Sequence, residues 1–165
     1  MASSPDILAW KPELDAIVGA RAHGQSKEII PRLKSLDERH PNVAEINYQL
    51  AWTCEAVSRP ADALPYYEKA IALGLAPNEL SGALLGLGTT LRALGQPARA
   101  AEVLRTGKTQ FPENREFDVF LALALHDLGE HTAALKLLIE TLCDTTEDPG
   151  LTAYQRAIRY AAEKL

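Results

Sequence analysis

The sequence from residue 87 to residue 104 reads LGTTLRALGQPARAAEVL, and residues 121–138, 34 positions later, read LALALHDLGEHTAALKLL. In both stretches a segment with apolar residues every three or four positions ends at a glycine, Gly95 or Gly129, and a second such segment follows. Apolar residues at this spacing predict amphipathic helices, and a glycine between them predicts a tight turn. Each stretch therefore predicts two helices joined by a short turn.

The turn residues recur along the whole chain. They are Gly24, Ser58, Gly95 and Gly129, which lie 34, 37 and 34 residues apart. A second set, Pro41, Pro77 and Pro112, lies 36 and 35 residues apart. The alternation of apolar and polar residues that predicts strands is almost absent. A period near 34 residues with two helices in each unit is typical of a helical repeat array.

Small residues fall where the two helices of each unit must come close. The pairs are Ala51 with Ala63, Gly88 with Ala100, and Ala122 with Ala134. Larger residues four positions after the second member of each pair, Tyr67, Leu104 and Leu138, are expected to fill the space between successive helix pairs. Together with the turn residues, this pattern resembles the tetratricopeptide repeat family over Ala44 to about Cys143.

The resemblance implies an all-α fold, a right-handed superhelical array of antiparallel helix pairs with about four repeats and a C-terminal capping helix. We expect a single domain over residues 1–165, divided into a degenerate first repeat (10–43), three further repeats (44–80, 81–114 and 115–148) and a capping helix (149–165). Ile17 and Ile29 occupy positions of the first repeat where small residues belong. The apolar stripe of the capping helix, expected to cover the last repeat, is Leu151, Tyr154, Ile158, Ala161 and Leu165.

The composition narrows the class of protein. The chain has 165 residues, 47% of them hydrophobic and 24% charged, with a net charge of −5. This balance is ordinary for a folded domain and argues against a nucleic-acid partner, which a basic face usually binds. The first residues do not resemble a secretory signal, and no apolar stretch is long enough for a membrane span. With only Cys54 and Cys143, both in apolar surroundings, we expect reduced thiols and a cytoplasmic location.

Catalytic and cofactor chemistry is not indicated. His126 and His131 lie five residues apart, which on one helix would direct their rings about 140° apart, so we expect no metal site. No cysteine or serine is accompanied by a histidine and a third group in a pattern typical of a nucleophile. The glycines near residue 86 do not follow the spacing of a phosphate loop. We therefore predict that the chain is not an enzyme and holds no cofactor.

The resemblance places the binding surface on the first helices of the repeats, which line a concave groove. The implied groove residues are Tyr48, Trp52, Leu85, Thr89, Arg92, Val119, Leu123 and His126. The family's best-known groove chemistry clamps a carboxylate with Lys and Asn at positions that here hold Tyr48, Trp52, Leu85, Thr89, Val119 and Leu123. This departure argues against a ligand of that kind and predicts an apolar peptide or helix instead.

Two functional hypotheses remain open at this point. The first is a protein-interaction module whose groove binds a peptide or helix of another protein. The second is a structural homodimer, in which Trp52 and its neighbours, or the helix over 151–165, meet a second copy of the chain. Two alternatives to the groove prediction also remain open. In the first, the chain's own N-terminal segment covers part of this surface. In the second, the repeat register is shifted by one residue and these side chains belong to ordinary helix packing.

Overall fold

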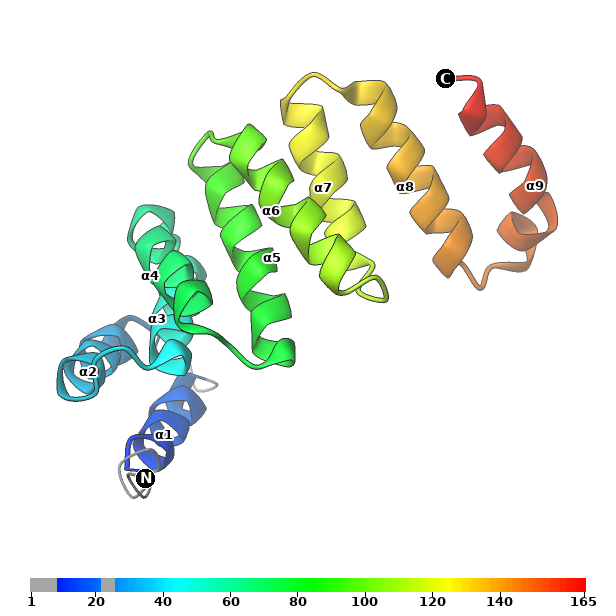
Figure 1. The fold of residues 1–165 in the computed structure, drawn as a ribbon. Coiled ribbons are helices and arrows are strands. Elements are labelled where there is room, and N and C mark those ends of the chain that lie inside the picture. The colour runs from blue at the N-terminus through cyan, green and yellow to red at the C-terminus, as the bar shows by residue number, and fades with distance from the viewer. Residues whose placement is uncertain (1–8, 22–25) are drawn as a thin grey trace, which may run out of the picture. The chain divides into compact units, whose positions relative to one another are not determined.

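The computed structural model describes residues 9–21 and 26–165, and within them it contains nine α-helices and no strand (Figure 1). The helices are α1 (Lys11–Arg21), α2 (Ser26–Arg39), α3 (Ala44–Ala56), α4 (Pro60–Leu73), α5 (Pro77–Ala93), α6 (Pro97–Gln110), α7 (Glu116–Asp127), α8 (His131–Thr145) and α9 (Pro149–Glu163). The predicted all-α fold is confirmed. The predicted turn at Gly24 lies outside the described residues.

The predicted turn residues have the backbone conformation that such turns require. Ser58, Gly95 and Gly129 adopt left-handed φ angles of 60°, 71° and 80°. This conformation ends one helix and lets the chain reverse into the next. Proline then begins helices α4, α6 and α9, since the first helical position needs no backbone N–H. Helix α5 also begins at a proline, Pro77, because the first helical position needs no backbone N–H. It therefore starts four residues before the start predicted for the third repeat.

The helices group into two compact units, one ending at Thr90 and the other comprising Leu91–Leu165. In the first unit, side chains of α1, α2 and α3 form one apolar cluster. Its members are Trp10, Leu14, Ile17, Ile29, Leu33, Leu36, Ile46 and Leu50. Helix α4 packs tightly on α3, where the predicted contact residues Ala51 and Ala63 are completely buried.

Helix α5 approaches α3 and α4 through two glycines. A Cβ atom added at Gly82 would lie 2.3 Å from the hydroxyl oxygen of Tyr48, and one added at Gly86 would lie 2.3 Å from that of Tyr67. Tyr67 is fully buried and donates a hydrogen bond of 2.6 Å to Glu55, whereas Tyr48 is only half-buried. The two tyrosines therefore fill the space that the missing glycine side chains leave, but only Tyr67 is fixed there.

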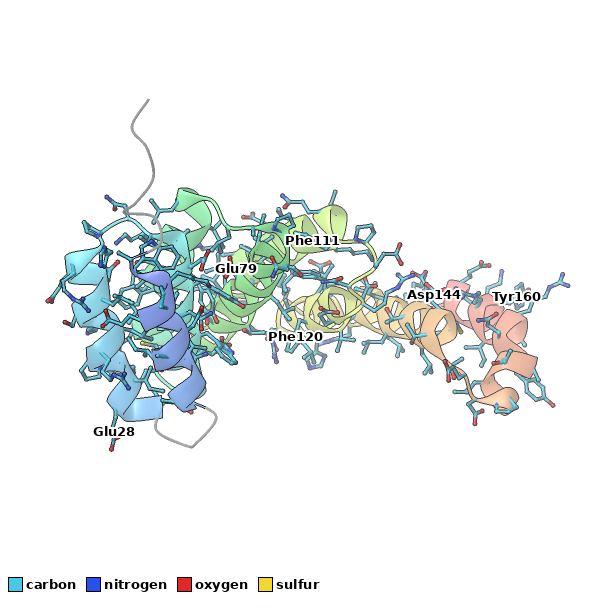
Figure 2. All side chains as sticks on the ribbon, turned by 90° about the horizontal axis from the view of Figure 1, so that it is seen from below. Glu28, Glu79, Phe111, Phe120, Asp144 and Tyr160 are labelled. Carbon is cyan, nitrogen blue, oxygen red and sulfur yellow. The ribbon has the colours of Figure 1, made fainter. Side chains whose placement is uncertain are left out.

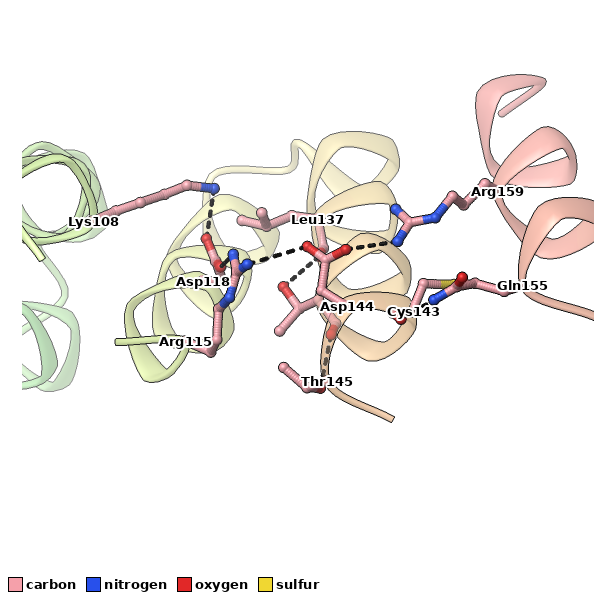
Figure 3. A network of polar contacts seen from close by, with 10 residues as sticks. Lys108, Arg115, Asp118, Leu137, Cys143, Asp144, Thr145, Gln155 and Arg159 are labelled. Atoms are coloured by element: carbon pink, nitrogen blue, oxygen red, sulfur yellow. Dashed lines mark hydrogen bonds and ion pairs between the residues drawn. The ribbon is translucent and has the colours of Figure 1, made fainter. Parts of the chain in front are cut away.

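The second unit is linked by a chain of ion pairs across four helices (Figure 3). Lys108 of α6 lies 2.5 Å from Asp118 of α7, and Arg115, at the start of α7, lies 3.4 Å from both Asp118 and Asp144 of α8. Asp144 also accepts a 2.6 Å hydrogen bond from Arg159 of α9. Asp118 is buried and sits in the first turn of α7, where the helix dipole favours a negative charge. The alternating charges set how these helices lie against each other.

Two expectations for the end of the chain are wrong. Leu138 does not fill a space between helix pairs but is 37% exposed. Of the stripe predicted for the last helix, Tyr154, Ala161 and Leu165 are exposed, and Leu151 and Ile158 are half-buried. The helix instead turns Gln155, Arg159 and Ala162 toward α8, because Gln155 donates a hydrogen bond to the Cys143 carbonyl and Arg159 pairs with Asp144.

Substitution of the two α5 glycines by alanine tests the close approach. Alanine favours a helix by about 1 kcal/mol over glycine, so Gly82→Ala should leave stability unchanged or raise it, because Tyr48 has room to move. Gly86→Ala should destabilise the chain by about 1–3 kcal/mol through overpacking against the fixed Tyr67 ring. Urea denaturation measures both. Equal effects of the two substitutions would show that Tyr67 is not fixed.

Acid should loosen α9 from α8. The hydrogen bond from Arg159 holds the pKa of Asp144 below its usual value. The pair therefore stabilises the folded state above the ordinary pKa of aspartate, and this contribution is lost as the pH falls through the lower, folded-state pKa. Hydrogen exchange of the α9 amides, corrected for intrinsic rates, should speed up between pH 6 and pH 3. In Asp144→Asn, exchange should already be faster at pH 6 and change less with acid.

Candidate protein-interaction surface

The first unit presents an exposed tryptophan on α3. Tyr48, Gln49 and Trp52 lie three and four positions apart and so share one face of the helix. Trp52 is 46% exposed, whereas Tyr48 is half-buried against Gly82. An exposed tryptophan beside a tyrosine is a composition typical of residues that anchor a protein partner.

An arginine that the sequence analysis did not single out completes this face. The guanidinium carbon of Arg21, at the end of α1, lies 3.9 Å from the centre of the Trp52 ring, within the range of a cation–π interaction. Its Nη2 atom donates a 2.8 Å hydrogen bond to Oε1 of Gln49. Its Nε and Nη1 atoms are buried and have no hydrogen-bond partner. Burial lowers the pKa of Arg21 to about 10, so the side chain remains charged at neutral pH.

The position of Arg21 within its repeat is the sequence feature that predicts it as a groove residue. If the first repeat begins at Trp10, Arg21 takes position 12, the position of Glu55 and Arg92 in the next two repeats. The same reading of the first helix also yields Lys11, which forms a 2.7 Å ion pair with Glu45.

Polar pairs join neighbouring first helices. Lys11 and Glu45 lie 34 residues apart in the sequence, as do Glu55 and Thr89, whose hydroxyl donates a 2.7 Å hydrogen bond to Glu55. These contacts show that α1 lies beside α3 and α3 beside α5 within the first unit. Thr89, a predicted groove residue, is half-buried through this contact. Leu85, one turn earlier on α5, is also half-buried.

The other predicted groove residues belong to the second unit. Arg92 is not free there, because its Nε lies 2.5 Å from a carboxylate oxygen of Asp127, 35 residues later. Val119 is 39% exposed and Leu123 is half-buried on the same helix, α7. The structure thus shows two sets of predicted residues, Tyr48, Trp52, Leu85 and Thr89 in one unit and Arg92, Val119, Leu123 and His126 in the other.

The geometry expected for His126 and His131 is wrong. Their Nδ1 atoms lie 3.0 Å apart, because the left-handed backbone at Gly129 ends α7 and folds α8 back, so a single helical period does not relate the two rings. Within residues 9–21 and 26–165 there is nonetheless no group of three or more side chains arranged to hold a metal ion. Cys54 and Cys143 are buried, and desolvation raises the pKa of Cys54, as expected for thiols that fill space.

The chain belongs to the tetratricopeptide repeat family, whose sequence model matches residues 44–165. The solved structure of YrrB, described as a TPR protein with an unusual peptide-binding site, superposes with a TM-score of 0.74 at 18% identity and covers 97% of this chain and 77% of YrrB. A structure of MamA superposes with a TM-score of 0.73 at 20% identity, covering 94% of this chain and 86% of MamA. Among curated proteins, none matches significantly. In the part of the chain that the structure describes, no helix is long and apolar enough to cross a membrane.

The family and the fold identify the chain as a protein-interaction module.

The exposure of Trp52 can be tested by fluorescence, since the chain has two tryptophans and Trp10 is buried. In Trp10→Phe, which leaves Trp52 alone, we expect emission near that of a hydrated indole and ready quenching by acrylamide. In Trp52→Phe, the remaining Trp10 should emit at shorter wavelength and resist the quencher. Similar quenching of the two variants would show that Trp52 is covered in solution.

Proposed function

We propose that the chain binds an apolar peptide or helix of another protein, and that the face formed by Tyr48, Trp52 and Arg21 is the centre of the binding site. The observation that carries the proposal is the half-exposed Trp52 ring stacked under the Arg21 guanidinium. Tryptophan, tyrosine and arginine are the residues enriched at the centres of protein interfaces. A ring fixed in place by a neighbour loses little further freedom on binding, which favours affinity.

The unpaired donors of Arg21 favour a ligand with an oxygen acceptor beside its apolar residue. A buried guanidinium whose Nε and Nη1 lack partners is costly, and a carbonyl or carboxylate oxygen that reached them after a small shift of the side chain would remove that cost. The guanidinium of Arg92, in contrast, already forms an ion pair with Asp127. We therefore propose that Arg21 contributes more to binding than Arg92.

The residues Val119, Leu123 and His126 of the second unit remain proposed as further contacts for a longer ligand. The helix pair α1–α2 is proposed to act as the first repeat, since it supplies Arg21 and Lys11 from the positions that the later repeats use. No catalytic role, cofactor, nucleic acid or membrane is part of the proposal, and a cytoplasmic location remains the expectation. The alternative function, a structural homodimer, is favoured by a different surface, on α8 and α9.

The test uses a library of random linear peptides displayed on phage, selected against the purified chain. We expect selected peptides to carry an aromatic or branched apolar residue, and we expect Trp52→Ala to weaken their binding about 30-fold, the equivalent of about 2 kcal/mol for an aromatic anchor. Arg21→Ala should weaken binding by at least tenfold and Arg92→Ala by less. Fluorescence polarisation with a labelled selected peptide gives the dissociation constants.

A matched control is Tyr160→Ala, which removes another exposed aromatic side chain, 63% exposed, from α9 (Figure 2). This substitution should leave peptide binding unchanged. Failure to select any peptide, or equal affinities of the wild type and Trp52→Ala, would contradict the proposed function. Circular dichroism spectra of the variants must match that of the wild type for the comparison to hold.

A further inference from the structure

Helix α8 carries a row of exposed leucines that the proposed peptide-binding face does not use. Leu135, Leu138 and Leu142 are 47%, 37% and 45% exposed. They lie three and four positions apart and therefore form one stripe along the helix. A soluble protein rarely leaves a contiguous apolar surface of this kind without a partner.

In the preceding repeat two of these three positions are covered by neighbouring helices, while the third, that of Leu142, holds the partly exposed Lys108. Ala101 and Leu104 of α6 lie 34 residues before Leu135 and Leu138, and they are 1% and 0% exposed. Helix α7 packs on α6 closely, with the Phe117 ring directly against Gly107. Helix α9 follows α8 in the same way along the chain but leaves the equivalent leucines uncovered.

Helix α9 leaves the stripe open because it is held to α8 by polar contacts on another side. Gln155 donates a hydrogen bond to the Cys143 carbonyl, and Arg159 pairs with Asp144. On α8, Asp144 is two residues after Leu142, a rotation of about 200° around the helix. The leucine stripe and the ion pair therefore lie on different sides of α8.

Helix α9 exposes apolar side chains as well. Tyr154 and Leu165 are 69% and 53% exposed. Tyr154 and Leu165 lie eleven positions apart, within about 20° of each other around α9, and neither belongs to the side that Gln155 and Arg159 turn toward α8. The exposed leucines of α8 together with Tyr154 and Leu165 of α9 are called here the α8–α9 face.

We propose that the α8–α9 face binds the same face of a second copy of this chain, related by a two-fold axis. The charged residues of α8, Lys136, Glu140 and Asp144, lie off the leucine stripe, so no like charges meet when two copies of the stripe are brought together. The exposed parts of the five apolar side chains amount to roughly 500 Å² in each copy, so a symmetric pair buries at most about 1,000 Å², at the lower end for specific interfaces.

A second copy suits this surface better than a separate partner, because the surface consists of apolar side chains and offers no charge to select a partner of opposite charge. An isologous contact uses the same patch twice, so a single stripe of leucines covers its own equivalent. The inference goes beyond the proposed peptide binding, since it uses neither Trp52 nor Arg21. With this proposal the chain has two binding surfaces, one for a peptide ligand and one for self-association.

The experiment is sedimentation equilibrium of the full chain between 5 and about 500 μM, chosen to span the affinities of weak to moderate interfaces. The proposal predicts a reversible monomer–dimer equilibrium with no larger species. Leu138→Glu should weaken the dimer at least tenfold. Leu142→Gln, which changes a more exposed leucine and disturbs folding less, should weaken it in the same direction.

Two controls separate this surface from the others. Tyr160→Glu places the same charge on a side of α9 that faces away from α8 and should leave the dimer intact, and so should Trp52→Ala. A wild-type chain that stays monomeric at the highest concentration would overturn the proposal, and so would a dimer unaffected by both leucine substitutions. A dimer lost only in Trp52→Ala would overturn it too and would place self-association on the proposed peptide-binding face.

Discussion

Side chains no larger than a methyl group lie where the helices of a pair must approach most closely, and the rest of the structure depends on that approach. Ala51 and Ala63 are completely buried in the packing of α4 on α3, and Gly86 lets α5 approach the buried Tyr67 ring. Helices at this distance interlock their neighbouring side chains, as native interiors require. A larger residue at one of these positions would separate the helices and move every residue on their outer faces.

In the first unit this spacing also arranges the face that we propose as the binding site. Because α1, α3 and α5 lie side by side, polar side chains of neighbouring repeats meet, as Lys11 meets Glu45 and Thr89 meets Glu55. The same arrangement places Arg21 over Trp52. The cation fixes the ring while leaving it half-exposed, so the surface is rigid and apolar at its centre and still accessible to a ligand.

Most of the fold could be predicted from the sequence, because turns and small contact residues are local signals that repeat. Gly95 and Gly129 marked helix ends correctly, and the small residues marked buried contacts. The partners of long polar side chains could not be predicted in the same way. The stacking of Arg21 on Trp52 depends on two helices, α1 and α3, that residues 22–25, helix α2 and residues 40–43 separate in the sequence. The sequence predicted the position of the last helix correctly but not which of its sides faces α8. The hydrogen bond of Gln155 and the ion pair of Arg159 determine that side, and the apolar stripe does not.

The claim that Trp52 and Arg21 form the binding centre is tested most directly by NMR on the ¹⁵N-labelled chain. The two tryptophan indole signals report separately on a buried site, Trp10, and on the proposed site, Trp52. Addition of a selected peptide should shift the Trp52 indole and the Arg21 Nε–H signals and leave the Trp10 indole unchanged. Saturable binding that shifts only signals of α8 and α9, with Trp52 and Arg21 unmoved, would contradict the account.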